Sequence, residues 1–280
     1  MYYESAPQLA WSALLKYIDG PIHRITDPEM YRMIQSNIRG GICHDSVRYA
    51  RANNKLISQL YNPTKPSSYI LYVDANNLYG WALSQLLPDG EYEWMSNDEC
   101  REAFEAFKDK ASRDRWFDEH EKQYYFEVEL DYPPELHDRD DDYPLAQETM
   151  TIKIVMTSEK QHEIRAKYFG AASPFSPKLV CSFIAKRKYV VQGSNLRFDL
   201  DRGLKLVKIH RGFGCTASAY FEPYITNNTN KRKLCKNDEV LRNFYKLMNN
   251  SVYGKTIKNV AKRSEIKLVT NETVARRLSE

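Results

Sequence analysis

The stretch at residues 69–80 reads YILYVDANNLYG, an apolar run followed by an aspartate and a turn. Its first five residues are apolar or aromatic without polar alternation, which is typical of a strand covered on both faces. The turn-rich segment NPTKPSS, residues 62–68, separates it from the preceding chain. We therefore expect a short buried strand over residues 69–73 that ends at Asp74.

Asp74 would hold its carboxylate at the end of this strand, beside the exposed backbone of a turn. Mg²⁺ prefers one or two carboxylates together with substrate phosphates, and a main-chain carbonyl such as that of Ala75 can complete its octahedron. An aspartate in this position can instead cap the helical turn that follows, and for an isolated aspartate capping is the more frequent role. Considered alone, Asp74 leaves both interpretations open.

A second group of polar residues lies in KLMNNSVYG, residues 246–254, at the end of a helix predicted over residues 238–250. Lys246, Asn250 and Tyr253 are spaced at helical intervals, so they project from one face. The ammonium suits a phosphate, the amide suits a sugar or base, and the ring suits a stacked base. A solvated lysine and a core tyrosine are the alternative interpretation. The apolar stripe predicted for another face of this helix consists of Leu241, Phe244, Met248 and Val252.

Other segments are placed by their periodicity and end signals. Residues 10–18 and a stretch that starts at Thr26-Asp27-Pro28 predict two helices. The alternation over residues 124–130 predicts a strand with one face toward water, and residues 178–191 indicate two strands joined by a turn. Residues 138–142 read DRDDD and indicate a surface loop.

The net charge of +4 is unevenly distributed along the chain. Residues 91–150 hold 7 basic and 20 acidic side chains, whereas residues 151–230 and residues 231–280 each hold 13 basic and 5 acidic ones. Basic segments of this kind suit a polyanion, because neutralising its phosphates releases condensed counterions. A solvated surface without a partner is the alternative interpretation.

Composition bounds the class of protein. The 280 residues are 42% hydrophobic and 28% charged, which is ordinary for a globular chain. No apolar stretch is long enough to span a membrane, and the start, MYYESAPQLAW, lacks the features of a signal peptide, so we expect an intracellular protein that is not secreted. The five cysteines are scattered without a C-x-x-C pair, which predicts reduced thiols and no zinc site.

Two motifs together resemble family B DNA polymerases, and especially their protein-primed branch in phages, viruses and self-synthesising transposons. That branch carries D-x-x-S-L-Y-P followed by K-x-x-x-N-S-x-Y-G. Here the two read DANNLYG and KLMNNSVYG, in the same order and with the second free of mismatches. A weaker match is IRGGI, residues 38–42, which is similar to the Y-x-G-G element that joins the exonuclease and polymerase parts in this branch.

The resemblance implies a role for each matched residue. Asp74 would be a ligand of the catalytic metals, with Ala75 as carbonyl donor, and Tyr79 would pack under the incoming sugar and exclude a 2′-hydroxyl. Lys246 would hold the triphosphate, while Asn250, Tyr253 and Gly254 would shape the nucleotide pocket. Contacts to DNA would come from Arg39, Gly40, Gly41, Lys231, Arg232, Lys233, Lys236 and Lys255.

The chain also departs from the family pattern. Asn77 stands for the family's serine, Gly80 for its proline and Ile38 for the tyrosine of the third motif. No Y-x-D-T-D-S follows residue 254, and nothing near the N-terminus resembles the D-x-E exonuclease motif. Because two-metal phosphoryl transfer takes its carboxylates from both polymerase motifs, we expect this chain alone not to extend a primer. Other carboxylates could substitute in principle, namely Asp131, Asp138, Asp140, Asp141 and Asp142, but a run of neighbouring acids is more typical of a solvated loop.

We therefore expect an α+β fold, an incomplete right-hand polymerase with palm strands and helical fingers. Its partners would be a DNA template and primer, dNTPs and two Mg²⁺ ions in the intact enzyme, with a terminal protein as a further candidate. The alternative is a non-catalytic nucleic-acid-binding remnant of a mobile element or virus-derived gene. The expected segments are an N-terminal helical region at 1–66, a palm segment at 67–130, an insertion at 131–214, fingers at 215–254 and the start of the return into the palm at 255–280.

Overall fold

The structure is a computed structural model that describes residues 3, 5–43, 45–47, 49–57, 60–151, 158–169, 177–258 and 268–279. The chain forms two compact units. The sheet unit consists of Ile22–Asp74 and Leu87–Ser218, and the helical unit consists of Met1–Pro21, Ala75–Leu86 and Ala219–Glu280. Helices together with an antiparallel sheet agree with the α and β content predicted from the sequence.

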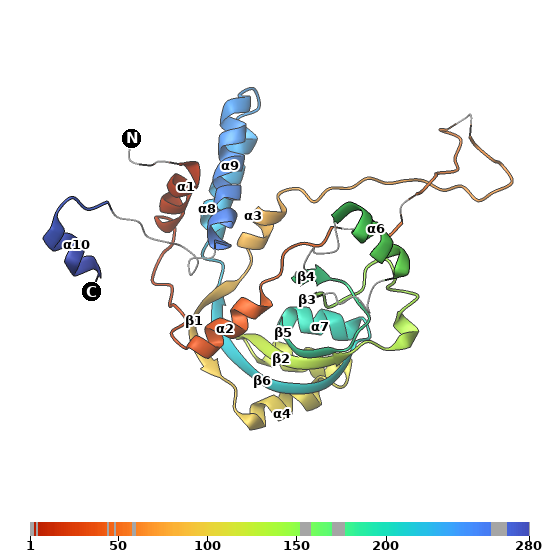
Figure 1. Ribbon diagram of the computed structural model, residues 1–280, viewed down its shortest axis with the longest axis horizontal. Helices are drawn as coiled ribbons and strands as arrows, with labels where there is room; N and C mark the ends of the chain where they lie inside the picture. The colour runs from red at the N-terminus through yellow and green to blue at the C-terminus, as the bar shows by residue number, and fades with distance from the viewer. Residues whose placement is uncertain are drawn as a thin grey trace. The chain divides into compact units, whose positions relative to one another are not determined.

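The sheet unit is built on a curled, four-stranded antiparallel sheet with the strand order β1-β6-β2-β5 (Figure 1). Strands β3 and β4 form a separate antiparallel pair. The strand predicted over residues 124–130 is confirmed as β2, and the two strands predicted within 178–191 are confirmed as β4 and β5, although each pairs in a different sheet. The strands are β1 (Leu87–Trp94), β2 (Gln123–Asp131), β3 (Glu148–Thr151), β4 (Pro177–Val180), β5 (Lys186–Gln192) and β6 (Lys205–Ser218). The helices are α2 (Pro28–Asn37), α4 (Asn97–Ala106), α5 (Lys110–Glu119), the short 3-10 helix η1 (Pro134–Leu136), α6 (Glu159–Phe169) and α7 (Gly193–Asp201).

One face of β2 supplies the centre of the main hydrophobic core. Phe126, Val128 and Leu130 alternate along the strand and are fully buried. Trp116 of α5 and Leu196 of α7 are buried in the same cluster. This face therefore follows directly from the alternation in the sequence, since every second side chain of a strand points the same way.

The opposite face of the sheet is covered rather than turned toward water, so that part of the sequence-based prediction is wrong. Met30 and Met33 of α2 pack there against Tyr125, Val190 and Phe213. The helix begins where the sequence predicted it to begin, because the Asp27 carboxylate accepts hydrogen bonds from the backbone of the first turn. The indole N–H of Trp94 on β1 also donates to Asp27, at 2.7 Å, and so fastens the start of α2 to the sheet.

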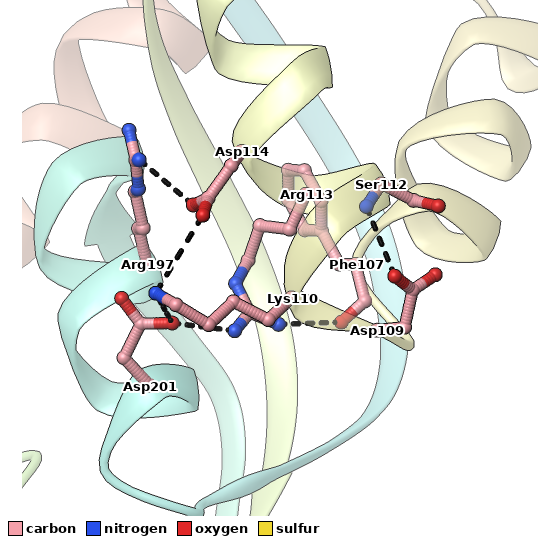
Figure 2. A network of polar contacts seen from close by, with 8 residues as sticks. All are labelled: Phe107, Asp109, Lys110, Ser112, Arg113, Asp114, Arg197 and Asp201. Atoms are coloured by element: carbon pink, nitrogen blue, oxygen red, sulfur yellow. Dashed lines mark hydrogen bonds and ion pairs between the residues drawn. The ribbon is translucent and has the colours of Figure 1, made fainter.

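A polar network joins α5 to α7 (Figure 2). The Arg113 guanidinium, only 6% exposed, donates to the Asp201 carboxylate at 2.6 Å and to the main-chain oxygen of Phe107 at 3.0 Å. Lys110 lies 3.3 Å from the same Asp201 oxygen. A second pair, between Arg197 of α7 and Asp114 of α5, spans 2.7 Å. The two helices are thus held by paired charges as well as by the core beneath them.

The helical unit contains α1 (Ala6–Leu15), α3 (Leu78–Leu83), α8 (Glu222–Leu234), α9 (Glu239–Thr256) and α10 (Glu272–Ser279). The helices predicted near residues 10–18 and 238–250 are confirmed as α1 and α9. Helices α8 and α9 pack together, and the buried Asn228 amide donates to Asn249 at 3.0 Å. Because a buried amide without a partner is costly, this pair fixes which faces of the two helices meet.

The apolar run at residues 69–73 is not a strand in the structure, which corrects the prediction made from its composition. Its side chains are strongly exposed, from 64% at Ile70 to 92% at Tyr72. A strand requires a neighbouring strand for its backbone hydrogen bonds, and none of the six strands in the described ranges pairs with this segment. The loop predicted at residues 138–142 is confirmed.

Two further expectations concern the cysteines and the membrane. All five cysteines are free, as predicted, and Cys100 and Cys215 are buried. Among the helices in the described residues, none combines the length and apolar character required to cross a bilayer.

Candidate nucleotide site

Helix α9 presents Lys246, Asn250 and Tyr253 along one face, as their spacing predicted. The helix starts at Glu239 because the Asp238 carboxylate accepts a hydrogen bond from the Leu241 backbone N–H at 2.9 Å. Lys246 is exposed, whereas Asn250 and Tyr253 are half-buried.

The predicted apolar stripe of α9 is buried only in its second half. Met248 and Val252 are buried, whereas Leu241 and Phe244 are 42% and 39% exposed. Packing against α1 and α8 therefore anchors the C-terminal part of α9, the part that carries the polar residues of the motif.

Tyr79 of α3 stacks on Tyr253 of α9. Their ring centroids lie 4.0 Å apart and the ring planes differ by 14°. Both residues belong to the helical unit, in which α3 packs against α8 and α9. The first and second motifs, which are far apart in the sequence, are thus brought into direct contact through two aromatic rings. Tyr79 remains 46% exposed, so part of its ring is free to meet a ligand.

The two departures from the family's first motif compensate for one another in the structure. Asn77 precedes α3 in the left-handed region, at φ 55°, a conformation that asparagine tolerates better than most residues. Its side chain lies over Gly80, where an added Cβ would come within 2.3 Å of the Asn77 amide nitrogen. Gly80 therefore leaves the space that the Asn77 side chain occupies, and the motif forms a tight turn into α3.

Gly254 follows Tyr253 near the end of α9 and is exposed. A Cβ added to it would meet no atom within 4 Å, and its φ lies outside the left-handed region. Neither the backbone conformation nor the packing of this chain therefore requires glycine at this position. The open space at Gly254 leaves room for a ligand to approach the backbone, and its role in the nucleotide pocket stays a prediction.

Asp74 and Ala75 lie in the exposed segment before α3, and the boundary between the two units falls between them. Among the described residues, no group of three or more His, Cys, Asp or Glu side chains is arranged to hold a metal ion. Asp74 does not follow a strand, which corrects the position predicted for it, because the apolar run before it has no partner among the strands that the structure describes. The role of Asp74 as a metal ligand stays a prediction.

The acidic loop at residues 138–142 contains one carboxylate with a clear structural role. Asp140 accepts hydrogen bonds from the Tyr132 hydroxyl at 2.6 Å and from Arg139 at 2.7 Å. The Arg139 bond is the larger influence that holds the pKa of Asp140 below its ordinary value. These contacts account for Asp140 as part of the loop's own structure.

Five of the eight residues predicted to contact DNA lie on α8, on α9 or in the connection between these helices. Lys231, Arg232 and Lys233 form the last turn of α8, where cations also interact favourably with the helix dipole. Lys236 follows in the connection to α9, and Lys255 lies in the last turn of α9. Contact of these residues with DNA stays a prediction.

Arg39, the third motif's basic residue, is held by the protein itself. Its guanidinium donates to the Val190 carbonyl and to the Asn37 side chain, both at 2.6 Å, and stacks on the Tyr189 ring at 4.2 Å. Gly40 and Gly41 follow in an irregular segment with no atom near their added Cβ positions. The role of Arg39 in fastening its segment to β5 is therefore visible, while a contact with DNA stays a prediction.

One residue that the sequence did not single out is Asp199 of α7. It is 6% exposed, and burial raises its pKa to about 7 although the nearby positive charge of Arg39 opposes the shift. In the sequence it stands within GSNLRFDLD and resembles any acidic residue on an exposed helix. No local signal distinguishes it from Asp201 two residues later, because only tertiary packing buries it.

No protein-family model matches the chain, and no curated protein matches it. Among solved structures, Phi29 DNA polymerase in an orthorhombic crystal form is similar, with a TM-score of 0.48 and 12% sequence identity over 92% of this chain and 37% of that chain. The same polymerase complexed with primer-template DNA, in a post-translocation binary complex, gives a TM-score of 0.47 and 14% identity, over 92% of this chain and 36% of that chain. The chain therefore spans little more than a third of the length of the polymerase whose structure it resembles.

Proposed function

We propose that this chain is the front part of the polymerase domain of a DNA-directed DNA polymerase, of the type that its motifs resemble. It would supply part of the palm and the nucleotide-binding helix of the fingers. The observation that supports the proposal is the stack of Tyr79 on Tyr253. It joins the two motif segments at the residues for which the resemblance implies contact with the incoming nucleotide.

Each side chain of the proposed site has a distinct task. The exposed Lys246 ammonium attracts the triphosphate, because a charge-assisted hydrogen bond to phosphate is stronger than a neutral one. The Tyr253 ring supports one face of the Tyr79 ring, and the incoming sugar packs against the part of Tyr79 that this stack leaves exposed. Asn250, one turn after Lys246, offers an amide to the sugar or base.

The proposed activity of the intact enzyme is template-directed transfer of dNTPs onto a primer, with Mg²⁺ as the metal and Asp74 as one of its ligands. The basic segments of the chain would contact the template and primer, and a terminal protein is a further proposed partner. By itself this chain is proposed to bind nucleotide and DNA without extending a primer.

Replacing Tyr79 tests the proposal at the contact that supports it. The wild-type chain is expected to bind a dNTP more tightly than the matching rNTP, because the Tyr79 ring occupies the space of the 2′-hydroxyl. Tyr79→Ala is expected to remove this preference and to weaken dNTP binding by about twofold to tenfold, since an aromatic pair contributes roughly 0.5–1.5 kcal/mol. Titration calorimetry with both nucleotides measures the ratio.

Tyr79→Phe is the matched control, because it keeps the ring and its stack on Tyr253. It is expected to retain the preference for the dNTP. Equal affinity of the wild-type chain for both sugars, or an unchanged ratio in Tyr79→Ala, would contradict the placement of the sugar at this ring.

Gly254→Ala separates binding from folding. The alanine side chain has free space and a better helix propensity, so the unfolding free energy is expected to rise by about 0.5 kcal/mol. Nucleotide affinity is expected to fall roughly tenfold, because one methyl group that crowds a bound ligand costs about 1–3 kcal/mol. Chemical denaturation and nucleotide titration of the same preparation measure the two effects. A variant that is more stable and binds equally well would show that no ligand approaches Gly254.

A further inference from the structure

The sheet unit contains a cavity of about 390 Å³ that the proposed nucleotide site does not use. It lies between the segment after α2, the chain before β3, strand β5 and helix α7. Its volume is within the range of pockets that hold small molecules. All of its lining residues belong to the sheet unit, so the cavity is complete within one compact part of the chain.

Helix α7 contributes the polar groups of one wall. Asn195, Phe198 and Asp199 are spaced at helical intervals and line the cavity together. Asn195 and Phe198 are exposed at its rim, whereas Asp199 is buried. The described residues donate no hydrogen bond to the Asp199 carboxylate, which therefore faces the cavity with its acceptors unsatisfied.

Arg39 also lines the cavity and is held in place by three contacts. Its two terminal nitrogens donate to Val190 and Asn37, and its guanidinium carbon lies over the Tyr189 ring, 4.2 Å from the ring centroid. The guanidinium thus supplies a positive charge and a flat surface. Guanidinium planes and aromatic rings are the surfaces on which nucleic-acid bases stack.

The charges of the cavity restrict the class of ligand. The Asp199 carboxylate disfavours an anionic ligand such as a phosphate or carboxylate. A cationic ligand is also disfavoured, because Arg39 already places a positive charge beside the cavity. The charges of the cavity therefore favour a neutral planar molecule with two adjacent N–H donors, because such a molecule donates two hydrogen bonds to the carboxylate without adding charge. The N1–H and N2–H groups of guanine have this arrangement, and the Gln147 and Asn195 side chains, which also line the cavity, can donate to its O6.

We propose that this cavity binds a guanine base, with the Asp199 carboxylate accepting hydrogen bonds from guanine N1–H and N2–H. The base comes either from a free guanine nucleoside or nucleotide or from an unpaired position of a nucleic-acid strand. The site is separate from the proposed nucleotide site on α9 and does not depend on it.

Ionisation of Asp199 provides a signature of the contact. The titratable residues that line the cavity are Asp199, Arg39 and Tyr189, and burial raises the pKa of Tyr189 to about 12, so only Asp199 changes charge near neutral pH. Glu148, next to the cavity, is paired with Lys186 at 2.8 Å. Two N–H donors favour the carboxylate, so guanine binding lowers the pKa of Asp199 and releases a proton. Affinity therefore rises with pH up to about 7 and levels off above it.

The test uses the 280-residue chain with guanosine, inosine and xanthosine as probes. Guanosine is expected to bind at least roughly tenfold more tightly than inosine, which lacks the N2 amino group, since a good bidentate pair is worth about 1–3 kcal/mol. Calorimetry in buffers of different ionisation enthalpy should detect the released proton near pH 7. Equal binding of guanosine and inosine, or binding without proton release, would overturn the proposal.

Asp199→Asn changes the hydrogen-bonding pattern without changing the size of the side chain. An amide donates and accepts, which matches the C2 carbonyl and N1–H of xanthosine. Compared with the wild type, the variant is therefore expected to bind guanosine roughly tenfold to a hundredfold more weakly and xanthosine more tightly by a similar factor. A gain of xanthosine binding also shows that the variant is folded. Guanosine binding that is retained in this variant would overturn the assignment. A loss of guanosine binding without a gain of xanthosine binding would also overturn it, provided that the variant keeps the circular dichroism and melting transition of the wild type.

One control variant and one series of oligonucleotides complete the design. Asp131→Asn removes a half-exposed carboxylate of the same sheet unit that lies outside the cavity. It is expected to bind guanosine like the wild type, and a loss of binding in this variant would contradict the location of the site. Oligothymidylates with and without a single dG distinguish the two sources of the base. If the oligothymidylate with dG binds the wild type more tightly than the one without it, and this difference is absent in Asp199→Asn, the base comes from a strand. If guanosine binds but the dG makes no difference, the base comes from a free nucleoside or nucleotide.

Discussion

Replacing Lys246 with alanine is expected to weaken dNTP binding by roughly tenfold to a hundredfold, because hydrogen bonds to charged groups contribute about 1.5–3 kcal/mol. Lys246 is exposed on α9 and makes no contact that the fold requires in the described part of the chain. The unfolding free energy should therefore change by less than about 0.5 kcal/mol. Titration with a dNTP and with the matching nucleoside should show the loss only for the triphosphate.

Arg242→Ala is the matched control for Lys246→Ala. Arg242 lies one turn earlier on the same face of α9, and its replacement removes the same net charge. If Lys246 holds the phosphates directly, Arg242→Ala should weaken binding by less than about threefold, through long-range electrostatics that salt screens. Equal losses in the two variants would show that general attraction, rather than a position on the helix, accounts for the affinity.

Asp201→Asn is expected to destabilise the sheet unit by about 2–3 kcal/mol, because it leaves the buried Arg113 charge without its carboxylate. The loss is smaller than for a fully buried pair, since the Asp201 side chain is 29% exposed and Arg113 retains its bond to the Phe107 carbonyl. Urea denaturation measures the change. Asp98→Asn is the control, because Asp98 and Arg101 form an exposed pair whose loss should cost at most about 0.5 kcal/mol.

The same contact predicts a pH dependence. Hydrogen bonds from Arg113 and then Lys110 lower the pKa of Asp201 in the folded chain, so this stabilisation is fully present above the ordinary pKa of an aspartate. It is lost as the pH falls through the lowered native pKa, when the carboxylate is protonated. The difference in unfolding free energy between the wild type and Asp201→Asn should therefore shrink on acidification. A difference that stays constant down to pH about 2 would contradict this account.

Local patterns in the sequence were sufficient for several elements. Asp27 and Asp238 cap their own helices through bonds to the next turn, so the starts of α2 and α9 depend on a few neighbouring residues. The alternation of Phe126, Val128 and Leu130 likewise places their side chains on one face of β2 whatever lies against it. The shared face of Lys246, Asn250 and Tyr253 follows from helical spacing alone.

Long-range packing accounts for what these patterns could not predict. The run at residues 69–73 has the composition of a buried strand, but composition cannot supply the partner that a strand needs for its backbone hydrogen bonds. The far face of the sheet was expected to meet water, yet Met30 and Met33 cover it, since a helix distant in the sequence packs there. Both differences have the same cause. A side chain is buried only when a second segment packs against it, and the local sequence does not specify that second segment.

The candidate sites divide in the same way. The residue types and order of the two motifs are properties of the sequence, and they predict a nucleotide site without reference to the fold. That Tyr79 and Tyr253 stack, and that Asn77 fits over Gly80, depends on how α3 packs against α9. Asp199 and Asp201 stand two residues apart on one short helix, yet one lines a cavity and the other pairs with Arg113. Adjacent turns of a helix face different neighbours, so the chemistry of each carboxylate was set by the tertiary structure and not by its place in the chain.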